Sequence, residues 1–262
     1  MPTLPRYNNG FSFLELGGKC ADLEVKSATF PTMASLVLEI YGGSSKDLHD
    51  ILASGVVYAG SIVSCGFDCQ ETFRENWSRA LLQQIQFPAL DASGHYDVVL
   101  VLTFQMIDVV LAPTQSGFYG SRRQKKRWSG CNFKFEIGGM QSCSRVSKIA
   151  AFVPGQDLVI TVMGEQSAAE FRSWLQTGNQ TRSGALAYLG ANFSAELTLS
   201  LVGLRIRSIA PFFPTNPSAA VTITLEYQGF GCNRSNGLPA SARSVKPLVL
   251  QVNSPWQQFR KG

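Results

Sequence analysis

Ser93, His95 and Asp97 are the residues whose types and closeness would suit nucleophilic catalysis. On a strand, His95 and Asp97 stand two residues apart and would share one face. A Ser–His–Asp triad, however, is assembled from distant segments of a chain, whereas this spacing is local. The sequence also has no phosphate-binding glycine loop, His-rich metal motif or dinucleotide fingerprint. We therefore predict that the chain is not an enzyme and uses no cofactor, and we expect His49, on a predicted helix, at the surface.

The cysteines are candidate metal ligands. The chain has six of them, and only Cys65 and Cys69 lie close together. A zinc site usually shows two tight Cys or His pairs, and this sequence has only two histidines. We therefore predict no metal site and expect isolated, buried thiols. A disulfide, either Cys65–Cys69 or one between chains, is the alternative if the mature particle is extracellular.

The most concentrated positive charge is one basic run in the middle of the chain. Its members are Arg122, Arg123, Lys125, Lys126 and Arg127. Such a run can contact DNA, because each neutralised phosphate releases counterions. A channel that passes DNA works better without strong positive charge, so a solvated loop, or a patch that meets an acidic partner, is the preferred interpretation. A large loss of DNA affinity in a filter-binding assay, after all five are changed to serine, would reverse this preference.

The composition is that of a folded chain with little charged surface. Of the 262 residues, 45% are hydrophobic and 16% are charged, and the net charge is +5. This is enough for one large core or for two cores of about 100 residues each. Low charge is typical of a chain that hides surface in an assembly, and also of a large β-sandwich. The longest apolar runs are shorter than the about 20 residues that span a bilayer, and the N-terminus lacks the apolar core of a signal peptide.

One pattern occurs twice: an apolar strand, a glycine turn and a helix that ends at glycine. It covers residues 36–55 and 158–178. In the second copy, Ser167 and Glu170 have the capping-box spacing, and either Ser44 or Ser45 would cap the first helix. Three other blocks recur in the same order, pairing 14–18 with 135–139, 88–94 with 213–219, and 98–104 with 221–227. We interpret the chain as a duplication; the alternative is a chance likeness of two β-rich segments.

The predicted organisation has four segments. They are a first unit at 8–107, a basic joint at 108–130, a second unit at 131–231 and a C-terminal extension at 232–262. Alternating apolar and polar residues predict mostly strands within the two units. Residues 71–86 are ambiguous, because they fit a helix while their counterpart in the second unit favours a strand. The extension has no counterpart and contains one possible strand, at 245–252.

The second unit resembles the tail-tube fold of contractile phage tails and related injection systems. The resemblance rests on an FxFxIGG-type strand at 133–139, on Trp174 and Leu175 at the end of a helix, and on two strands around a proline-containing break at 206–230. It covers residues 131–231 and, more weakly, residues 10–107. It implies a mainly β chain of two tandem β-sandwich or barrel units, each with one flanking α-helix. In that family, subunits join edge to edge, their sheets close a ring, and rings stack into a hollow tube.

The duplication and the resemblance together imply a ring-forming structural protein of a virion tail, assembled in the host cytoplasm. Most family members carry one unit and form six-subunit rings, so three of these chains would form a ring with pseudo-sixfold symmetry. A baseplate hub or tube-initiating ring of this kind passes DNA or protein cargo and is not inserted in a membrane; the alternative is a main tube subunit. The implied partners are copies of the chain and tail tube, spike, baseplate or sheath proteins, with DNA only in transit.

The strand predicted at 221–227 is the best candidate for the wall of the channel. Thr222, Thr224 and Glu226 alternate with apolar residues and would form its wet face. Its counterpart at 98–104 is far more apolar, so the two units would not present the same wall. A different class of function is a receptor- or glycan-binding β-sandwich at a tail tip, which needs exposed aromatic side chains in loops. The candidates for that role are Phe118, Tyr119 and Trp128.

Overall fold

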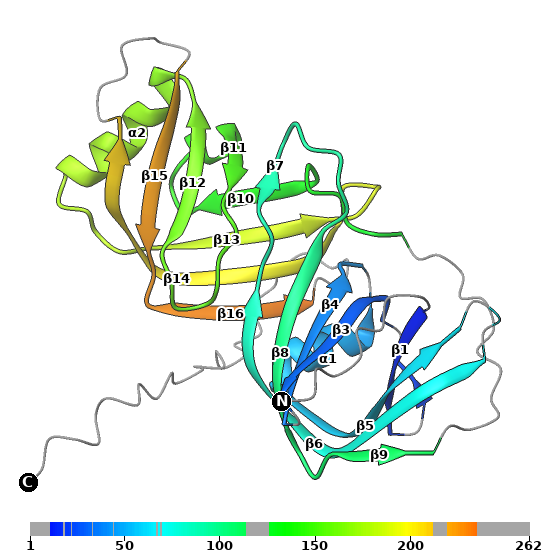
Figure 1. The fold of residues 1–262 in the computed structure, drawn as a ribbon. Helices are drawn as coiled ribbons and strands as arrows, with labels where there is room; N and C mark the ends of the chain where they lie inside the picture. The colour runs from blue at the N-terminus through cyan, green and yellow to red at the C-terminus, as the bar shows by residue number, and fades with distance from the viewer. Residues whose placement is uncertain are drawn as a thin grey trace, which may run out of the picture.

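The computed structural model describes residues 11–234, apart from 18, 22, 33, 44, 67, 69, 114–125 and 212–218. This part of the chain is mainly β and forms two units, each with one sheet and one α-helix. Figure 1 shows the first unit from blue to green and the second from green to orange. The predicted fold class, mainly β in two units with one helix each, is therefore confirmed.

The first sheet is nearly a barrel. The elements of this part of the chain are β1 (Phe11–Leu16), β2 (Lys19–Cys20), β3 (Val25–Thr32), β4 (Ser35–Tyr41), α1 (Lys46–Ser54), β5 (Val56–Cys65), β6 (Glu71–Gln86), β7 (Leu90–Asp91), β8 (Val99–Ile107) and β9 (Val110–Ala112). The strand order is β2-β1-β3-β4-β8-β6-β5, with β9 on β6. Strand β1 also pairs along its whole length with β5, whereas its pairing with β3 is limited to Ser12 and Val25. Among the described strands, one edge of β3 is thus almost without a partner.

The second sheet stays open. Its elements are β10 (Phe133–Ile137), the short 3-10 helix η1 (Ser142–Arg145), β11 (Val146–Ile149), β12 (Leu158–Met163), α2 (Glu165–Gln176), β13 (Arg182–Leu189), β14 (Ala195–Ala210), β15 (Ala220–Glu226) and β16 (Gly229–Arg234). The strand order is β10-β13-β14-β15-β12-β11-β7, with β16 on β14. Strand β7 comes from the first half of the chain and covers the edge of β11. Among the described strands, β10 and β11 are not paired with each other.

The two sheets have the same strand order. Reading across the first sheet gives β3-β4-β8-β6-β5-β1, and reading across the second gives β11-β12-β15-β14-β13-β10. Each strand of the first series corresponds in chain order to the strand at the same place in the second. The register agrees in detail, because a β-bulge interrupts both the β3–β4 and the β11–β12 pairing, at residues 25–27 and 146–148. The repeat in the sequence is therefore a repeat of topology. The pairing of block 98–104 with 221–227 is wrong by two residues, because Leu36 pairs with Phe104 as Leu158 pairs with Leu225.

The repeat extends past both predicted unit boundaries. Strand β9 continues from β8 along the long strand β6, after a kink at Asp108, whose φ is 54°. In the same way β16 continues from β15 along the long strand β14, opposite Gly203, whose φ is 71°. Strand β9 lies in the segment predicted as the joint, and β16 reaches into the predicted extension. The two strands are counterparts that the sequence comparison did not detect.

The two helices begin differently. Ser45 caps α1, and its side chain accepts a hydrogen bond from the Leu48 amide at 3.2 Å. Helix α2 begins after Gly164 and has no side-chain cap, so the capping box predicted for Ser167 is wrong. The carboxylate of Glu170 instead accepts hydrogen bonds from the backbone amides of residues 141 and 142, which orders the start of η1. The residue that precedes the helix is Gly164, whose φ of 86° favours glycine, so the glycine marks the start of α2.

Other local predictions are resolved by the strand pairing. Residues 71–86 form strand β6, as their counterpart favoured, because both edges find partners in β5 and β8. The strand expected just before the proline-containing break is the end of one long strand, β14. The strand expected at 245–252 lies outside the described residues. Apart from a small cluster of Phe13, Val63 and Cys65, the buried apolar side chains of both units form one continuous core rather than two.

Candidate functional site: exposed sheet faces and the junction of the units

The outer face of β15 is polar and partly exposed. Thr222 and Thr224 are half-buried and Glu226 is exposed, while the alternating apolar residues of the strand are fully buried. The neighbouring strands continue this face, with Thr161 opposite Thr222 and Arg205 opposite Glu226. The face also carries Lys148, opposite Thr161 and ion-paired with Asp91. A sheet face of hydroxyl groups and paired charges can line a water-filled space without binding phosphate tightly.

The corresponding face of the first unit has a different chemistry. On β8, Val99, Val101 and Thr103 are half-buried, and the residues between them are buried. Across the sheet, Glu39 pairs with Val101, and its carboxylate forms an ion pair with Lys26 at 3.1 Å. The two units therefore share a topology but present a hydroxyl-rich face in one case and a valine-rich face in the other.

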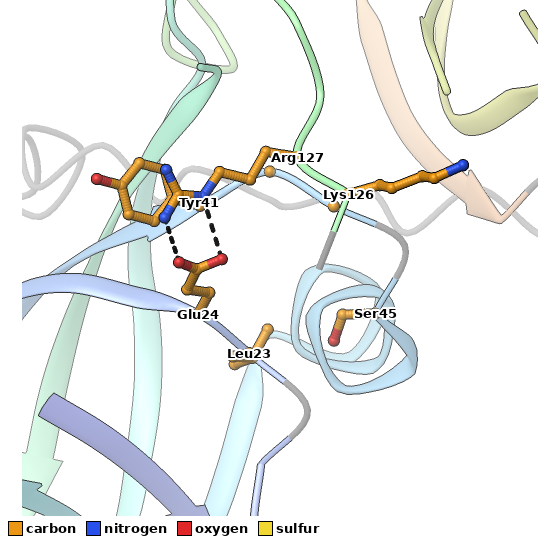
Figure 2. Close-up of a pocket in the computed structure, with 8 residues that line it drawn as sticks. Leu23, Glu24, Tyr41, Ser45, Lys126 and Arg127 are labelled. Atoms are coloured by element: carbon orange, nitrogen blue, oxygen red, sulfur yellow. Dashed lines mark hydrogen bonds and ion pairs between the residues drawn. The ribbon is translucent and has the colours of Figure 1, made fainter. Parts of the chain in front are cut away.

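Arg127, the last residue of the basic run, is engaged within the chain. Its guanidinium forms an ion pair with Glu24 and lies 3.6 Å from the centre of the Tyr41 ring (Figure 2). It forms a second ion pair with Asp97, at 2.6 Å. The hydrogen bonds with Glu24 and then Asp97 raise its pKa, so the charge is permanent. The pKa shift has that direction because both partners are carboxylates. Arg127 thus fastens the end of the joint to β4 and to the residues just before β3 and β8 rather than offering a free cation.

Of the rest of the basic run, only Lys126 lies among the described residues. Lys126 is exposed and extends away from the Glu24 carboxylate (Figure 2). It lines a small hollow beside Ser45 at the start of α1. Arg122, Arg123 and Lys125 lie outside the described residues. Their proposed contact with a partner stays a prediction.

Of the predicted disulfide pair, only Cys65 lies among the described residues. Cys65 is buried and packs with Phe13 and Val63 in a small cluster separate from the main core. Cys69 lies outside the described residues, so the Cys65–Cys69 pairing stays a prediction. Burial raises the pKa of the Cys143 thiol to about 11 and that of the Cys232 thiol to about 12, which keeps both protonated at neutral pH.

The three residues considered for catalysis do not form a triad. The hydroxyl of Ser93 donates a 2.6 Å hydrogen bond to Asp91, and Asp97 is paired with Arg127. The nearest described partner of His95 is the thiol of Cys131, at 3.7 Å from Nδ1. No hydrogen bond therefore connects a nucleophile, a base and an orienting carboxylate among these residues.

The first seam between the units is a strand addition. Leu90 of β7 pairs with Ile149 of β11, and Leu90 is buried. Phe87 and Phe152 exchange backbone hydrogen bonds of 2.9 and 3.1 Å, and their rings are stacked with centroids 5.0 Å apart. At the exposed side, Lys148 forms a 2.8 Å ion pair with Asp91, and this bond, followed by those from Ser93, lowers the pKa of Asp91. The connection between β6 and β8, two strands of the first sheet, therefore supplies a strand, β7, to the second sheet.

The second seam is the packing of α1 against β16 of the second unit (Figure 1). His49 was expected at the surface but is buried, with its ring nitrogens 2.5 Å from the Ser45 carbonyl and 3.0 Å from the Glu196 carbonyl. Trp128 is 1% exposed, and its indole N–H donates a 2.5 Å hydrogen bond to the Glu196 carboxylate. Its ring stacks on Tyr188, with centroids 5.2 Å apart. A buried tryptophan is no receptor contact, and the other two candidates, Phe118 and Tyr119, lie outside the described residues.

The described part of the chain contains no group of three or more His, Cys, Asp or Glu side chains that could hold a metal ion. Nor does it contain a helix with the length and apolar character needed to cross a membrane. Sequence reasoning did not identify the residues at the two seams between the units. The only signal for them was the presence of aromatic and glycine residues around the predicted joint. No protein-family model matches this chain, and no curated protein matches it.

Proposed function

We propose that this chain is a structural protein that associates with copies of itself into a ring around a central channel, as a baseplate hub or tube-initiating ring of a phage-like contractile tail. The observation that carries the proposal is the identical strand order of the two units, joined through one continuous core. A chain of this kind supplies two similar building blocks in a fixed relation. Three chains then supply six blocks, which is what a ring needs to connect a threefold spike to a sixfold tube.

The exposed strand edges support self-association. Strand β10 and most of β3 each have one edge without a partner among the described strands. Open edges of this kind invite pairing with other chains, so a folded protein either shields them or uses them. Closing a ring uses every edge and leaves none for uncontrolled aggregation. The second unit's open sheet fits this use better than it fits a solitary β-sandwich.

The hydroxyl-rich face of β15 is the proposed wall of the channel. Thr222, Thr224 and Glu226 would face the bore, where DNA or protein passes without tight contact. The engagement of Arg127 inside the chain agrees with this, because it removes one cation from the set available to phosphates. Tail tube, spike, baseplate and sheath proteins remain the proposed partners. A main tube subunit is the alternative within the same class and would differ by stacking into many rings.

The proposal is tested by measuring the mass and the shape of the assembled protein. The purified chain is analysed by light scattering over a range of concentrations and imaged by negative-stain electron microscopy. We expect a particle of three chains with a stain-filled centre and six similar lobes. Long stacks of rings would favour the main tube subunit. A monomer at every concentration, or a compact oligomer without a channel, would refute the proposed function.

A further inference from the structure

We infer that His49 is a pH-sensitive clamp between the two units. When its imidazole is protonated, it bridges α1 of the first unit and β14 of the second, and when the imidazole loses that proton, one half of the bridge is lost. His49 lies at the second seam, where α1 packs against β16. The clamp acts within one chain, so it does not depend on whether copies of the chain assemble into a ring.

Both ring nitrogens of His49 face backbone carbonyl oxygens. Nδ1 lies 2.5 Å from the Ser45 carbonyl of the same helix, and Nε2 lies 3.0 Å from the Glu196 carbonyl of β14. A carbonyl oxygen only accepts hydrogen bonds, so each contact needs an N–H on the imidazole. The neutral imidazole has one N–H, whereas the imidazolium has two. Only the protonated side chain can therefore donate to both carbonyls at once and join the two units.

The Glu196 carbonyl depends on this bridge because Glu196 stands outside the strand ladder. Strand β13 pairs with Ala195 and with Leu197 but skips Glu196, which is the extra residue of a β-bulge. On the other edge, the described pairing of β14 with β16 reaches only as far as Leu197. The bulge directs the Glu196 carbonyl to His49 and the Glu196 carboxylate to Trp128. Because His49 is buried, water replaces a lost hydrogen bond poorly, and one carbonyl would then face a nitrogen lone pair.

The surroundings of His49 can accept a positive charge. Among the described side chains, the titratable groups of α1 and of the segments packed against it are Lys46, Asp47, Asp50, Lys126, Glu196 and Cys232. Burial raises the pKa of Cys232 to about 12, so its thiol is neutral. Strand β5, which also packs against α1, contains no Asp, Glu, Lys, Arg or His. Three carboxylates thus stand against two lysines, and a proton on His49 balances them.

The first test observes the protons of the imidazole directly, and the chain supplies its own reference because it has only two histidines. The other one, His95, is exposed, and no carbonyl contact is described for its imidazole. Nitrogen NMR of the full chain distinguishes the imidazolium from the neutral form, and His95→Gln assigns the two sets of signals. We expect His49 to keep both ring protons to a higher pH than His95 does. If His49 loses its second proton at the same pH as His95, or at a lower one, the clamp is refuted.

The second test measures what the clamp contributes to stability, by urea unfolding of the full chain at about pH 5.5 and about pH 8.5. A proton that the folded chain holds more tightly than the unfolded chain stabilises fully below about pH 6.5, the value for an unfolded-chain histidine, and this contribution is lost as the pH rises.

We expect the unfolding equilibrium constant of His49→Gln, divided by that of the unmodified chain, to be at least ~10-fold larger at the lower pH. The control variant, His95→Gln, should give the same ratio at both pH values. A ratio for His49→Gln that is equally independent of pH would overturn the clamp. Circular dichroism checks that both variants fold, and the nitrogen spectra of the unmodified chain decide the question if His49→Gln does not.

Discussion

Trp128 is expected to couple the two units energetically through its hydrogen bond to Glu196. Changing Trp128 to Phe keeps an aromatic ring on Tyr188 but removes the indole N–H that lies 2.5 Å from the carboxylate. A hydrogen bond to a charged group contributes about 1.5–3 kcal/mol, and the smaller ring leaves a void at a site that is 1% exposed. We expect Trp128→Phe to lower the free energy of unfolding by about 2–4 kcal/mol.

A double-mutant cycle separates the hydrogen bond from the packing. Trp128→Phe, Glu196→Ala and the double variant are compared by urea unfolding, followed by circular dichroism. We expect a coupling energy of about 1.5–3 kcal/mol, because each single change removes the same bond. Trp174 is the matched control, since its indole N–H donates a 2.8 Å bond to the Gln180 carbonyl within the second unit. Trp174→Phe and Glu196→Ala should be additive. A Trp128–Glu196 coupling below about 0.5 kcal/mol would show that this bond does not link the units.

Three further predictions concern single side chains. Burial would raise the pKa of Glu170, but hydrogen bonds from the amides of 141–142 lower it below its usual value. Glu170→Gln should therefore destabilise the protein at pH 7. In urea unfolding, the stability difference between the two proteins should fade as the pH falls below about 4.3. Burial raises the pKa of Cys232 to about 12, so mass spectrometry at pH 8 should find it alkylated by iodoacetamide at least ~10-fold more slowly than Cys131, although both residues are half-buried. The Asn179 side chain forms hydrogen bonds with both the amide and the carbonyl of Ile206 in β14, and Asn179 itself has a φ of 48°. Glycine tolerates this φ, so Asn179→Gly removes only the hydrogen bonds. The free energy of unfolding in urea should fall by about 1–3 kcal/mol.

The duplication could be read from the sequence because it repeats local signals. In α1, the capping serine at 45 and the stop at Gly55, with a φ of 65°, follow from the chemistry of helix ends. The same reasoning was wrong for Ser167, because Gly164 already starts the helix and the carboxylate of Glu170 is used by the backbone before η1. A capping motif predicts a possible bond, and tertiary contacts decide whether that bond forms.

Strand β6 shows where local reasoning becomes ambiguous. Its sequence fits a helix as well as a strand, and its pattern of burial is irregular, with a bulge between Leu82 and Gln84. Its state is set by β5 on one edge and by β8 and β9 on the other. The repeat supplied this non-local information, because its counterpart β14 alternates clearly enough to be identified as a strand.

The junction could not be predicted, because it depends on contacts between segments that are far apart in the chain. Strand β7 has only two residues, which is too short for any periodic signal. Trp128 and His49 carried no pattern that distinguishes a buried junction from a loop or a helix surface. Their burial follows from the approach of the β13–β14 hairpin, which brings Glu196 to both. A search for aromatic residues next to repeat boundaries is the one sequence signal that would have selected Trp128.

The repeat is imperfect at one place in the junction between the units. Phe152 donates a backbone hydrogen bond to Phe87 and stacks on its ring inside the chain. On β3, the register with β4 shifts between Thr29 and Thr32, so β3 departs from β11 just before the place that corresponds to Phe152. Among the described strands, nothing pairs with β3 at this place, and the stacked phenylalanines are therefore a feature of the internal junction that the repeat does not reproduce. The duplicated topology thus accounts for the sheets, whereas the aromatic contact that joins them is specific to one copy of the repeat.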